Sequence, residues 1–172
     1  MNSCVFLDRD GVINKDNPNY TFRVTDFEIL PGVIDALKRL KSKGYLLIVV
    51  TNQSGIAQGL YTRPQMEECH QYFQEQNGNL IDHFYFSPDH PSVTASISRK
   101  PGTLMFEKAI AKFKIDVKNS WMIGDRGRDI IPARKLGIRT IQIGDEIDEH
   151  ERADHQVANL QDASKIILDR AH

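Results

Sequence analysis

The chain has 172 residues, of which 40% are hydrophobic and 26% charged, and its net charge is −1. These values are typical of one soluble globular domain, so we expect residues 1–172 to form a single domain. The near-zero charge disfavours nucleic acid and acidic membrane surfaces as partners.

Three further features concern the cellular compartment. No apolar stretch approaches the roughly 20 residues that cross a bilayer, and the N-terminal residues lack the pattern of a signal peptide. The two cysteines, Cys4 and Cys69, belong to no disulfide or metal-binding pattern. We therefore expect a cytoplasmic protein without membrane contact.

Short apolar runs predict five β-strands. Their unbroken hydrophobic character is typical of parallel strands that helices cover on both faces. The runs span residues 4–7, 45–50, 84–86, 121–123 and 140–143.

Helical patterns lie between these runs. Hydrophobic residues recur at helical spacing from Val33, and Gly44 follows as a stop signal. Thr62 and Gln65 form the capping-box pattern that begins a helix reaching about residue 76. The charged run within residues 145–159 is interpreted as a solvated connecting loop. Further helices are predicted over residues 104–113, 129–136 and 160–170.

The alternation of strands and helices predicts a three-layer α/β/α Rossmann-like domain with a mainly parallel sheet. About 40 residues separate Asp10 from Thr51, and about 50 separate Thr51 from Lys100. Because the predicted elements fill most of both gaps, we expect no cap domain. Residues 14–27 and 87–98 match no regular element and are expected to edge an open site.

Polar residues stand where the strands of such a sheet end, which is where these folds bind ligands. The pattern combines four acidic residues with a threonine and a lysine that precedes a helix. Parallel strands bring these ends to one edge, so we expect the side chains to meet there. The residues are Asp8, Asp10, Thr51, Lys100, Asp125 and Asp129.

This set of residue types indicates phosphoryl transfer. Carboxylates gathered without histidine or cysteine favour Mg²⁺, which offsets their mutual repulsion. We expect Asp8 to attack phosphorus as a nucleophile and Asp10 to serve as general acid and base. Thr51 would hold phosphoryl oxygens, and Lys100 would offset the charge of the transition state.

Each motif taken alone has a plainer interpretation. Aspartates after strands often cap turns or helices, and Thr51 by itself is more often part of a turn than of a phosphate site. A single lysine such as Lys100 is usually a solvated charge. These plain interpretations are largely independent, so the occurrence of all four elements in order favours a catalytic site.

The four elements resemble the motifs of the haloacid dehalogenase superfamily. Residues 8–14, with the sequence DRDGVIN, resemble the first motif, Thr51 the second, Lys100 the third, and Gly124-Asp125 with Asp129 the fourth. The resemblance implies that Mg²⁺ is held by the Asp8 carboxylate, the Asp10 carbonyl and Asp125. It also implies that Asp129 supports this metal site through a water molecule or through a hydrogen bond to one of the ligands.

A closer likeness covers roughly residues 4–145. Residues 30–33 (LPGV), 50–57 (VTNQSGIA) and 99–102 (RKPG) are similar to the family of D-glycero-D-manno-heptose-1,7-bisphosphate 7-phosphatases and the related histidinol-phosphatases. In that family the positions of Asn52 and Arg99 contact substrate oxygens. We expect the substrate-binding residues to be Asn14, Asn52, Gln53, Ser54, Arg99 and Arg126.

One segment departs from this family. Its members commonly hold a structural zinc ion with three cysteines and a histidine in the loop before the Arg-Lys-Pro motif. Here Ser87, Asp89, Ser96 and Ser98 stand roughly at those positions, and serine is a poor zinc ligand. We therefore expect no structural zinc.

The leading functional hypothesis is a Mg²⁺-dependent phosphatase for a small phosphorylated sugar, with the heptose 1,7-bisphosphate hydrolysed at its 7-position. Histidinol phosphate is the nearest alternative substrate, and a nucleotide or nucleic-acid end is a third. A non-catalytic binding module and a phosphotransferase are also considered, but the acidic residues and Lys100 are all present. We expect the protein to act as a monomer or a weak dimer.

Overall fold

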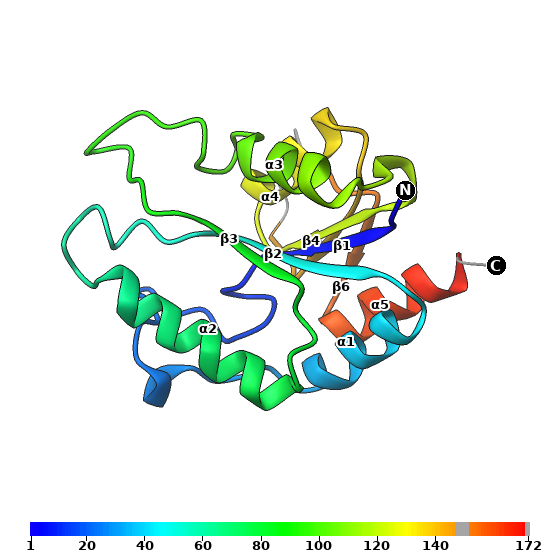
Figure 1. Ribbon diagram of the computed structural model, residues 1–172, viewed down its shortest axis with the longest axis horizontal. Helices are drawn as coiled ribbons and strands as arrows, with labels where there is room; N and C mark the ends of the chain where they lie inside the picture. The colour runs from blue at the N-terminus through cyan, green and yellow to red at the C-terminus, as the bar shows by residue number, and fades with distance from the viewer. Residues whose placement is uncertain (147–151, 171–172) are drawn as a thin grey trace.

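A computed structural model describes residues 1–146 and 152–170. Its centre is a six-stranded sheet in the order β3-β2-β1-β4-β5-β6, and every neighbouring pair is parallel (Figure 1). The predicted parallel sheet is thus confirmed. The strands are β1 (Cys4–Leu7), β2 (Leu46–Asn52), β3 (His83–Ser87), β4 (Trp121–Gly124), β5 (Arg139–Ile143) and β6 (His155–Val157).

Helices cover both faces of the sheet, which confirms the three-layer architecture. Helices α3 and α4 lie on one side, and α1, α2 and α5 lie on the other (Figure 1). The helices are α1 (Val33–Ser42), α2 (Arg63–Asn77), α3 (Leu104–Phe113), α4 (Gly127–Lys135) and α5 (Leu160–Asp169), with short 3₁₀ turns η1 (Val24–Asp26) and η2 (Val117–Asn119). None of the described helices is long and apolar enough to span a bilayer.

The residues of strand β1 are uniformly apolar because the strand contacts a hydrophobic core on each of its two faces. Cys4 and Phe6 belong to the core under α3 and α4, whereas Val5 and Leu7 belong to the core under α1, α2 and α5. Successive side chains of a strand point to opposite faces, so a strand covered on both sides needs hydrophobic residues at every position. All four are fully buried.

Helix α2 begins and ends where its local sequence predicts. The Thr62 and Gln65 side chains form a reciprocal capping box, and Gly78 ends the helix in the left-handed conformation with φ of 73°. Helix α4 begins at Gly127, two residues before the predicted start at Asp129. Its first turn is polar and therefore lacks the hydrophobic spacing that marks the rest of the helix.

The sequence left open whether residues 145–159 do more than connect, and the structure shows a strand in this segment. Residues 155–157 form β6, which pairs with β5 at the edge of the sheet. The Asp154 carboxylate accepts hydrogen bonds from the backbone and hydroxyl of Thr140, which fixes this strand in place. A three-residue strand with polar residues carries no sequence signal of its own. Asp148, Glu149 and Glu151 of the charged run lie outside the described residues.

The strand order creates a switch point between β1 and β4. From β1 the chain builds outward through β2 and β3, then returns to add β4 on the other side. At such a point the loops after the two strands diverge and leave a crevice at the carboxyl edge. Asp8 follows β1 there, and its backbone N–H donates to the carbonyl of Ile123 in β4 at 3.0 Å.

Replacing Phe6 tests the central position of β1. Phe6 is fully buried and contacts the Phe106 ring at a centroid distance of 5.2 Å. Phe6→Ala should lower the free energy of unfolding by about 3–5 kcal/mol, measured by urea denaturation, because it leaves a cavity in a packed core. Leu60→Ala, at a side chain that is 53% exposed, should change it by less than about 0.5 kcal/mol. Equal effects of the two substitutions would contradict this account of the core.

Candidate active site

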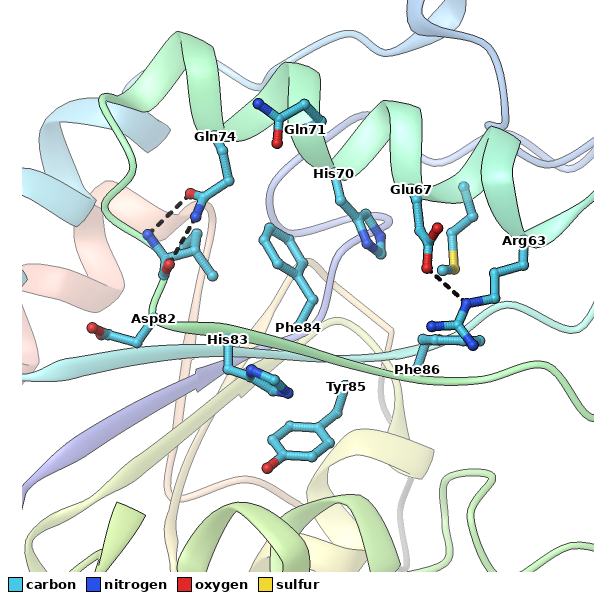
Figure 2. Close-up of a pocket in the computed structure, with 12 residues that line it drawn as sticks. Arg63, Glu67, His70, Gln71, Gln74, Asp82, His83, Phe84, Tyr85 and Phe86 are labelled. Atoms are coloured by element: carbon cyan, nitrogen blue, oxygen red, sulfur yellow. Dashed lines mark hydrogen bonds and ion pairs between the residues drawn. The ribbon is translucent and has the colours of Figure 1, made fainter. Parts of the chain in front are cut away.

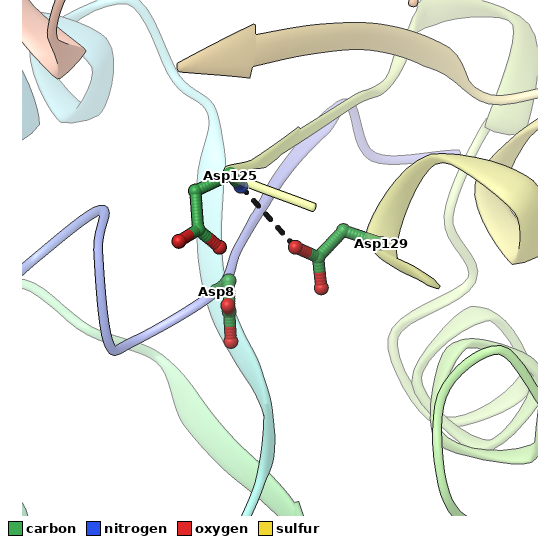
Figure 3. A group of neighbouring side chains, drawn as sticks. All are labelled: Asp8, Asp125 and Asp129. Carbon is green, nitrogen blue, oxygen red and sulfur yellow. Dashed lines mark hydrogen bonds between the residues drawn. The ribbon is translucent and has the colours of Figure 1, made fainter. Parts of the chain in front are cut away.

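Three carboxylates meet at the carboxyl edge of the sheet. Asp8 follows β1, Asp125 follows β4, and Asp129 lies in the first turn of α4 (Figure 3). One oxygen from each lies within 4.8 Å of the others. Strands β1 and β4 are neighbours, which explains why residues separated by more than a hundred positions come together.

Lys100 pairs with two of these three carboxylates. Its Nζ donates to Asp8 Oδ1 at 2.9 Å, to Asp129 Oδ1 at 2.5 Å and to the carbonyl of Val50 at 2.7 Å. These three acceptors match the three N–H bonds of an ammonium group. Burial disfavours the charged form, but Asp129 and Asp8 outweigh it and raise the Lys100 pKa. Lys100 is therefore a buried cation.

The single lysine does not balance the three acids. Burial, together with the charge of Asp129, raises the pKa of Asp8 to about 6 even against Lys100. Burial and the charges of Asp8 and Asp129 raise the pKa of Asp125 to about 8. The Asp125 Oδ1 atom is buried and accepts no hydrogen bond from the described residues. Such a group of oxygen ligands fits a hard divalent cation.

Gly11 allows the chain to approach Asp125 closely. A Cβ atom at position 11 would lie 2.2 Å from Asp125 Oδ2, and the residue has φ of +87°. Any side chain would therefore both strain the backbone and displace the carboxylate. This explains why glycine follows the two aspartates of the first motif.

Both carboxylate oxygens of Asp129 accept hydrogen bonds from other residues of the protein. Oδ2 accepts the backbone N–H groups of Asp125 and Arg126, each at 3.2 Å, and Oδ1 accepts Lys100. It thus holds the loop that carries Asp125 and fixes the lysine. This geometry suits the supporting role that we expected, which remains a prediction.

Asp10 lies in a different electrostatic environment from Asp8. Its Oδ1 accepts from Arg9 at 3.0 Å and from Asn14 at 2.9 Å, and its Oδ2 accepts from Gln53 at 3.1 Å. Burial alone would raise the pKa of Asp10, but the Arg9 charge and these hydrogen bonds lower it. The surroundings therefore shift the pKa values of the two acids of the first motif in opposite directions, upward for Asp8 and downward for Asp10.

Arg9 is a site residue that the sequence analysis missed. The side chain is buried, donates to Asp10 and to the Thr21 carbonyl at 2.7 Å, and lies over the Phe27 ring. It links the first motif to the segment of residues 14–27. The sequence signal was an arginine between the two aspartates of the first motif, two residues after the end of β1.

Three amides that we expected to contact substrate are engaged within the protein instead. Asn14 donates to Asp10, and Gln53 donates to Asp10 and Thr51. Asn52 exchanges two hydrogen bonds with the backbone of Lys100, at 2.9 and 3.1 Å. A sequence pattern shows which polar residues gather at a site, but it does not show which of them point at one another.

The remaining predicted residues lie around the carboxylates. The Thr51 hydroxyl is buried and accepts from Gln53 at 2.9 Å, and Ser54, three residues further along the chain, is also buried. Arg99 donates to the carbonyl of Asp89 at 3.1 Å. Arg126 is 43% exposed and its guanidinium lies 2.6 Å from Glu146, 3.5 Å from Asp16 and 3.6 Å from Asp125. It is partly exposed, whereas Asn14, Gln53 and Ser54 are buried.

Three serines of residues 87–98 form a hydrogen-bonded cluster with Asp89. Ser98 Oγ lies 2.9 Å from Ser87 Oγ, 2.8 Å from Ser96 Oγ and 3.0 Å from Asp89 Oδ2. These residues stand roughly at the positions where the resemblance led us to expect zinc ligands in the family. Side-chain hydrogen bonds thus connect the two ends of this loop next to Arg99.

A second hollow lies away from the carboxylates. A groove of about 570 Å³ is lined by residues of α2 and of the edge strand β3, and Figure 2 shows the His70 and Phe84 rings next to each other among them. Their rings stack at a centroid distance of 4.4 Å. None of the six acidic, threonine and lysine residues predicted to carry chemistry lines this groove.

Comparison with known proteins agrees with this geometry. The HAD-hydrolase-like family profile matches residues 97–169. D-glycero-beta-D-manno-heptose-1,7-bisphosphate 7-phosphatase of Haemophilus ducreyi is 39% identical over 145 residues, which are 79% of each chain. The enzyme of that name from Pasteurella multocida is 32% identical over 97% of each chain.

Solved structures give the same fold. D,D-heptose 1,7-bisphosphate phosphatase from B. bronchiseptica, complexed with magnesium and phosphate, superposes with a TM-score of 0.89 over 98% of this chain and 99% of that one, at 22% identity. A putative HAD-like phosphatase from Mesorhizobium loti has a TM-score of 0.83 at 23% identity, covering 96% of this chain and 86% of that one.

The fold and the relatives together place the chain among the haloacid dehalogenase-like hydrolases, as a phosphoric monoester hydrolase. Within them it belongs to the heptose-bisphosphate 7-phosphatase family, since long stretches are 32–39% identical to members of that name. The resemblance drawn from the sequence motifs is thereby confirmed.

Replacing Lys100 tests the charge balance of the site. In metal-free buffer, Lys100→Met should lower the free energy of unfolding by about 3–5 kcal/mol, because it leaves Asp8 and Asp129 as uncompensated buried acids. Urea denaturation measures this change. Adding Asp129→Asn to Lys100→Met should restore part of the loss, because it removes one of the two charges.

A matched control uses Lys165, which pairs with Asp162 at 3.1 Å on the surface. Lys165→Met should cost less than about 1 kcal/mol. If Lys100→Met costs no more than this control, Lys100 does not balance the buried acids.

Proposed function

We propose that the chain hydrolyses a phosphate monoester of a small sugar through a phosphorylated Asp8. The observation that carries this proposal is the position of Asp8, a buried carboxylate at the switch point with one oxygen fixed by Lys100. Asp8 Oδ2 accepts no hydrogen bond from the described residues, so it is the oxygen available to attack phosphorus. The result is an aspartyl-phosphate and a free sugar hydroxyl.

Mg²⁺ suits this site as the cofactor. The buried Asp125 Oδ1 atom lacks a hydrogen-bond donor among the described residues, and the acids outnumber the single lysine. We infer that the carboxylates of Asp8 and Asp125 and the backbone carbonyl of Asp10 hold the ion. When bound, Mg²⁺ would offset the repulsion between the phosphate and the carboxylates.

Asp10 is proposed as the group that moves protons. Its lowered pKa keeps it ionised at neutral pH, which is the form that takes a proton from the water hydrolysing the intermediate. Donation to the leaving oxygen requires the protonated form. A negative phosphate beside Asp10 favours that form, because a like charge raises the pKa of a carboxyl group.

Lys100 and Thr51 are proposed to assist without forming bonds to carbon or phosphorus. The Lys100 ammonium already orients Asp8 and offsets charge as the phosphoryl group is transferred. The Thr51 hydroxyl donates only a long hydrogen bond of 3.4 Å to the Asn52 carbonyl, so it can turn to donate to a phosphoryl oxygen while its own oxygen accepts from Gln53. Arg99 and Arg126 add positive charge at the rim of the site.

The substrate proposed first is D-glycero-D-manno-heptose 1,7-bisphosphate, hydrolysed at its 7-phosphate. The names of the relatives support it, and two rim arginines suit a substrate with a second phosphate. We further infer that residues 1–172 act as one cytoplasmic domain, as a monomer or weak dimer. The serine cluster would replace a structural zinc ion, so stoichiometric zinc in the purified protein would contradict this inference.

A turnover screen tests the substrate. Heptose bisphosphate, histidinol phosphate, hexose phosphates and nucleotides should be compared by kcat/KM at saturating Mg²⁺. The heptose bisphosphate should give the highest value. Turnover of nucleotides alone would overturn the substrate proposal while leaving the chemistry at Asp8 intact.

Asp8→Asn should abolish turnover of every substrate in this screen, because an amide cannot form the acyl phosphate. Phosphate release measures turnover, and circular dichroism should show an unchanged fold. Asp35→Asn, in the first turn of α1 away from the site, is the control and should keep full activity. Near-normal hydrolysis by Asp8→Asn would end the nucleophile assignment.

Asp125→Asn separates metal binding from catalysis. Saturation of wild type with Mg²⁺ at a hundredfold its Kd should raise the thermal midpoint by roughly 5–10 °C, because a ligand of the folded state stabilises it. Asp125→Asn should lose this rise. In metal-free buffer at pH 7 the variant should instead melt above wild type. The raised pKa means that folding must take up a proton that the unfolded carboxyl has lost, and asparagine removes this cost. An equal Mg²⁺ response in both proteins would contradict the ligand set.

A further inference from the structure

The Gln53 side chain connects a tyrosine to the proposed acid–base residue. The Tyr61 hydroxyl donates to Gln53 Oε1 at 2.7 Å. Gln53 Nε2 in turn donates to Asp10 Oδ2 at 3.1 Å and to Thr51 Oγ1 at 2.9 Å. Tyr61 and Gln53 are both buried, so water cannot readily replace either partner. The chain of contacts runs from a residue outside the carboxylate cluster to an oxygen of Asp10.

The chemistry of an amide makes this arrangement directional. One end of Gln53 only accepts hydrogen bonds, and the other end only donates them. The Tyr61 O–H supplies a donor on the Oε1 side, so the NH₂ group faces Asp10 and Thr51. A flipped amide would put Oε1 against the Asp10 carboxylate, where two acceptors repel each other. Tyr61 therefore selects the amide orientation that Asp10 needs.

The surroundings hold Tyr61 in one position. Its ring stacks on Phe22 with a centroid distance of 5.2 Å and an interplanar angle of 5°, and the Tyr20 ring lies 5.8 Å away. On another side, a Cβ atom at Gly55 would lie 2.2 Å from the tyrosine ring. Burial raises the Tyr61 pKa well above its usual range, so the hydroxyl stays protonated and remains a donor.

The two oxygens of Asp10 are thus held by different residues. Arg9 and Asn14 fix Oδ1, and Gln53 alone among the described side chains donates to Oδ2. A carboxyl group that must face first a leaving oxygen and then a water molecule loses efficiency when it rotates. The orientation of the Asp10 Oδ2 atom therefore depends on the Tyr61–Gln53 pair.

We propose that Tyr61 is a positioning residue for the phosphatase reaction, acting through Gln53 on the Oδ2 atom of Asp10 without touching substrate. The inference rests on the proposed function, in which Asp10 protonates the leaving oxygen. Tyr61 directly precedes Thr62, the N-cap of α2, and would thus affect the reaction rate from outside the carboxylate cluster.

The dependence of the rate on the leaving group tests this proposal. A sugar phosphate needs a proton on its leaving oxygen, whereas 4-nitrophenyl phosphate leaves readily without one. The value of kcat/KM covers only the steps up to release of the alcohol, so it isolates this difference. Tyr61→Phe should lower kcat/KM for the sugar phosphate roughly tenfold, part of the 10²–10⁴-fold contribution of general acid catalysis. For 4-nitrophenyl phosphate it should change less than about twofold.

Controls separate this inference from the function on which it rests. Asp10→Asn should show the same leaving-group selectivity more strongly. Gln53→Met, which has a similar shape but cannot donate to Asp10, should follow Tyr61→Phe. Tyr72→Phe, at a partly buried tyrosine elsewhere on α2, should leave both substrates unchanged. Thermal melting should show that each variant is folded.

Each outcome then decides one question. If Asp10→Asn is selective but Tyr61→Phe slows both substrates equally or neither, Tyr61 has no positioning role and the proposed function stands. If Asp10→Asn itself shows no selectivity, the acid assignment fails, and the inference about Tyr61 fails with it.

Discussion

The buried ammonium of Lys100 is the interaction on which the rest of the site depends. It contacts two of the three clustered carboxylates and a backbone carbonyl of β2. Charges this deeply buried are stable only when they are paired and fully hydrogen-bonded. Burial and the two neighbouring acids raise the pKa of Asp125, and Arg126, 3.6 Å away, offsets their effect only in part. The same imbalance that is unfavourable in the free protein makes the site a strong match for a divalent cation.

A second constraint is the contrast between the two aspartates of the first motif. Asp8 has a raised pKa because burial and neighbouring acids outweigh Lys100, whereas the Arg9 cation and two amides lower that of Asp10. When two nearby carboxyl groups have different environments, their pKa values differ, and each can then take a different role in the reaction. Here one acid is fixed for attack and the other is ionised and oriented by Arg9 and by the Tyr61–Gln53 pair.

Much of this fold and site could be predicted from the sequence, because buried parallel strands and strand-end acids leave strong local patterns. Asp8, Lys100, Asp125 and Asp129 meet as expected, since the topology determines where strands end. The partners of Gln53 and the role of Arg9 could not be predicted, because they depend on which way a side chain turns within a crowded edge. Strand β6 was missed because three residues paired at a sheet edge owe their conformation to β5 rather than to their own sequence.

Trapping the covalent intermediate tests the central claim most directly. Wild-type protein should be mixed with Mg²⁺ and excess substrate, then treated with borohydride, which reduces an acyl phosphate to an alcohol. Peptide mass spectrometry should find homoserine at position 8 and unmodified aspartate at positions 10, 125 and 129. Reduction at another aspartate, or no reduction during active turnover, would contradict a reaction that proceeds through phosphorylated Asp8.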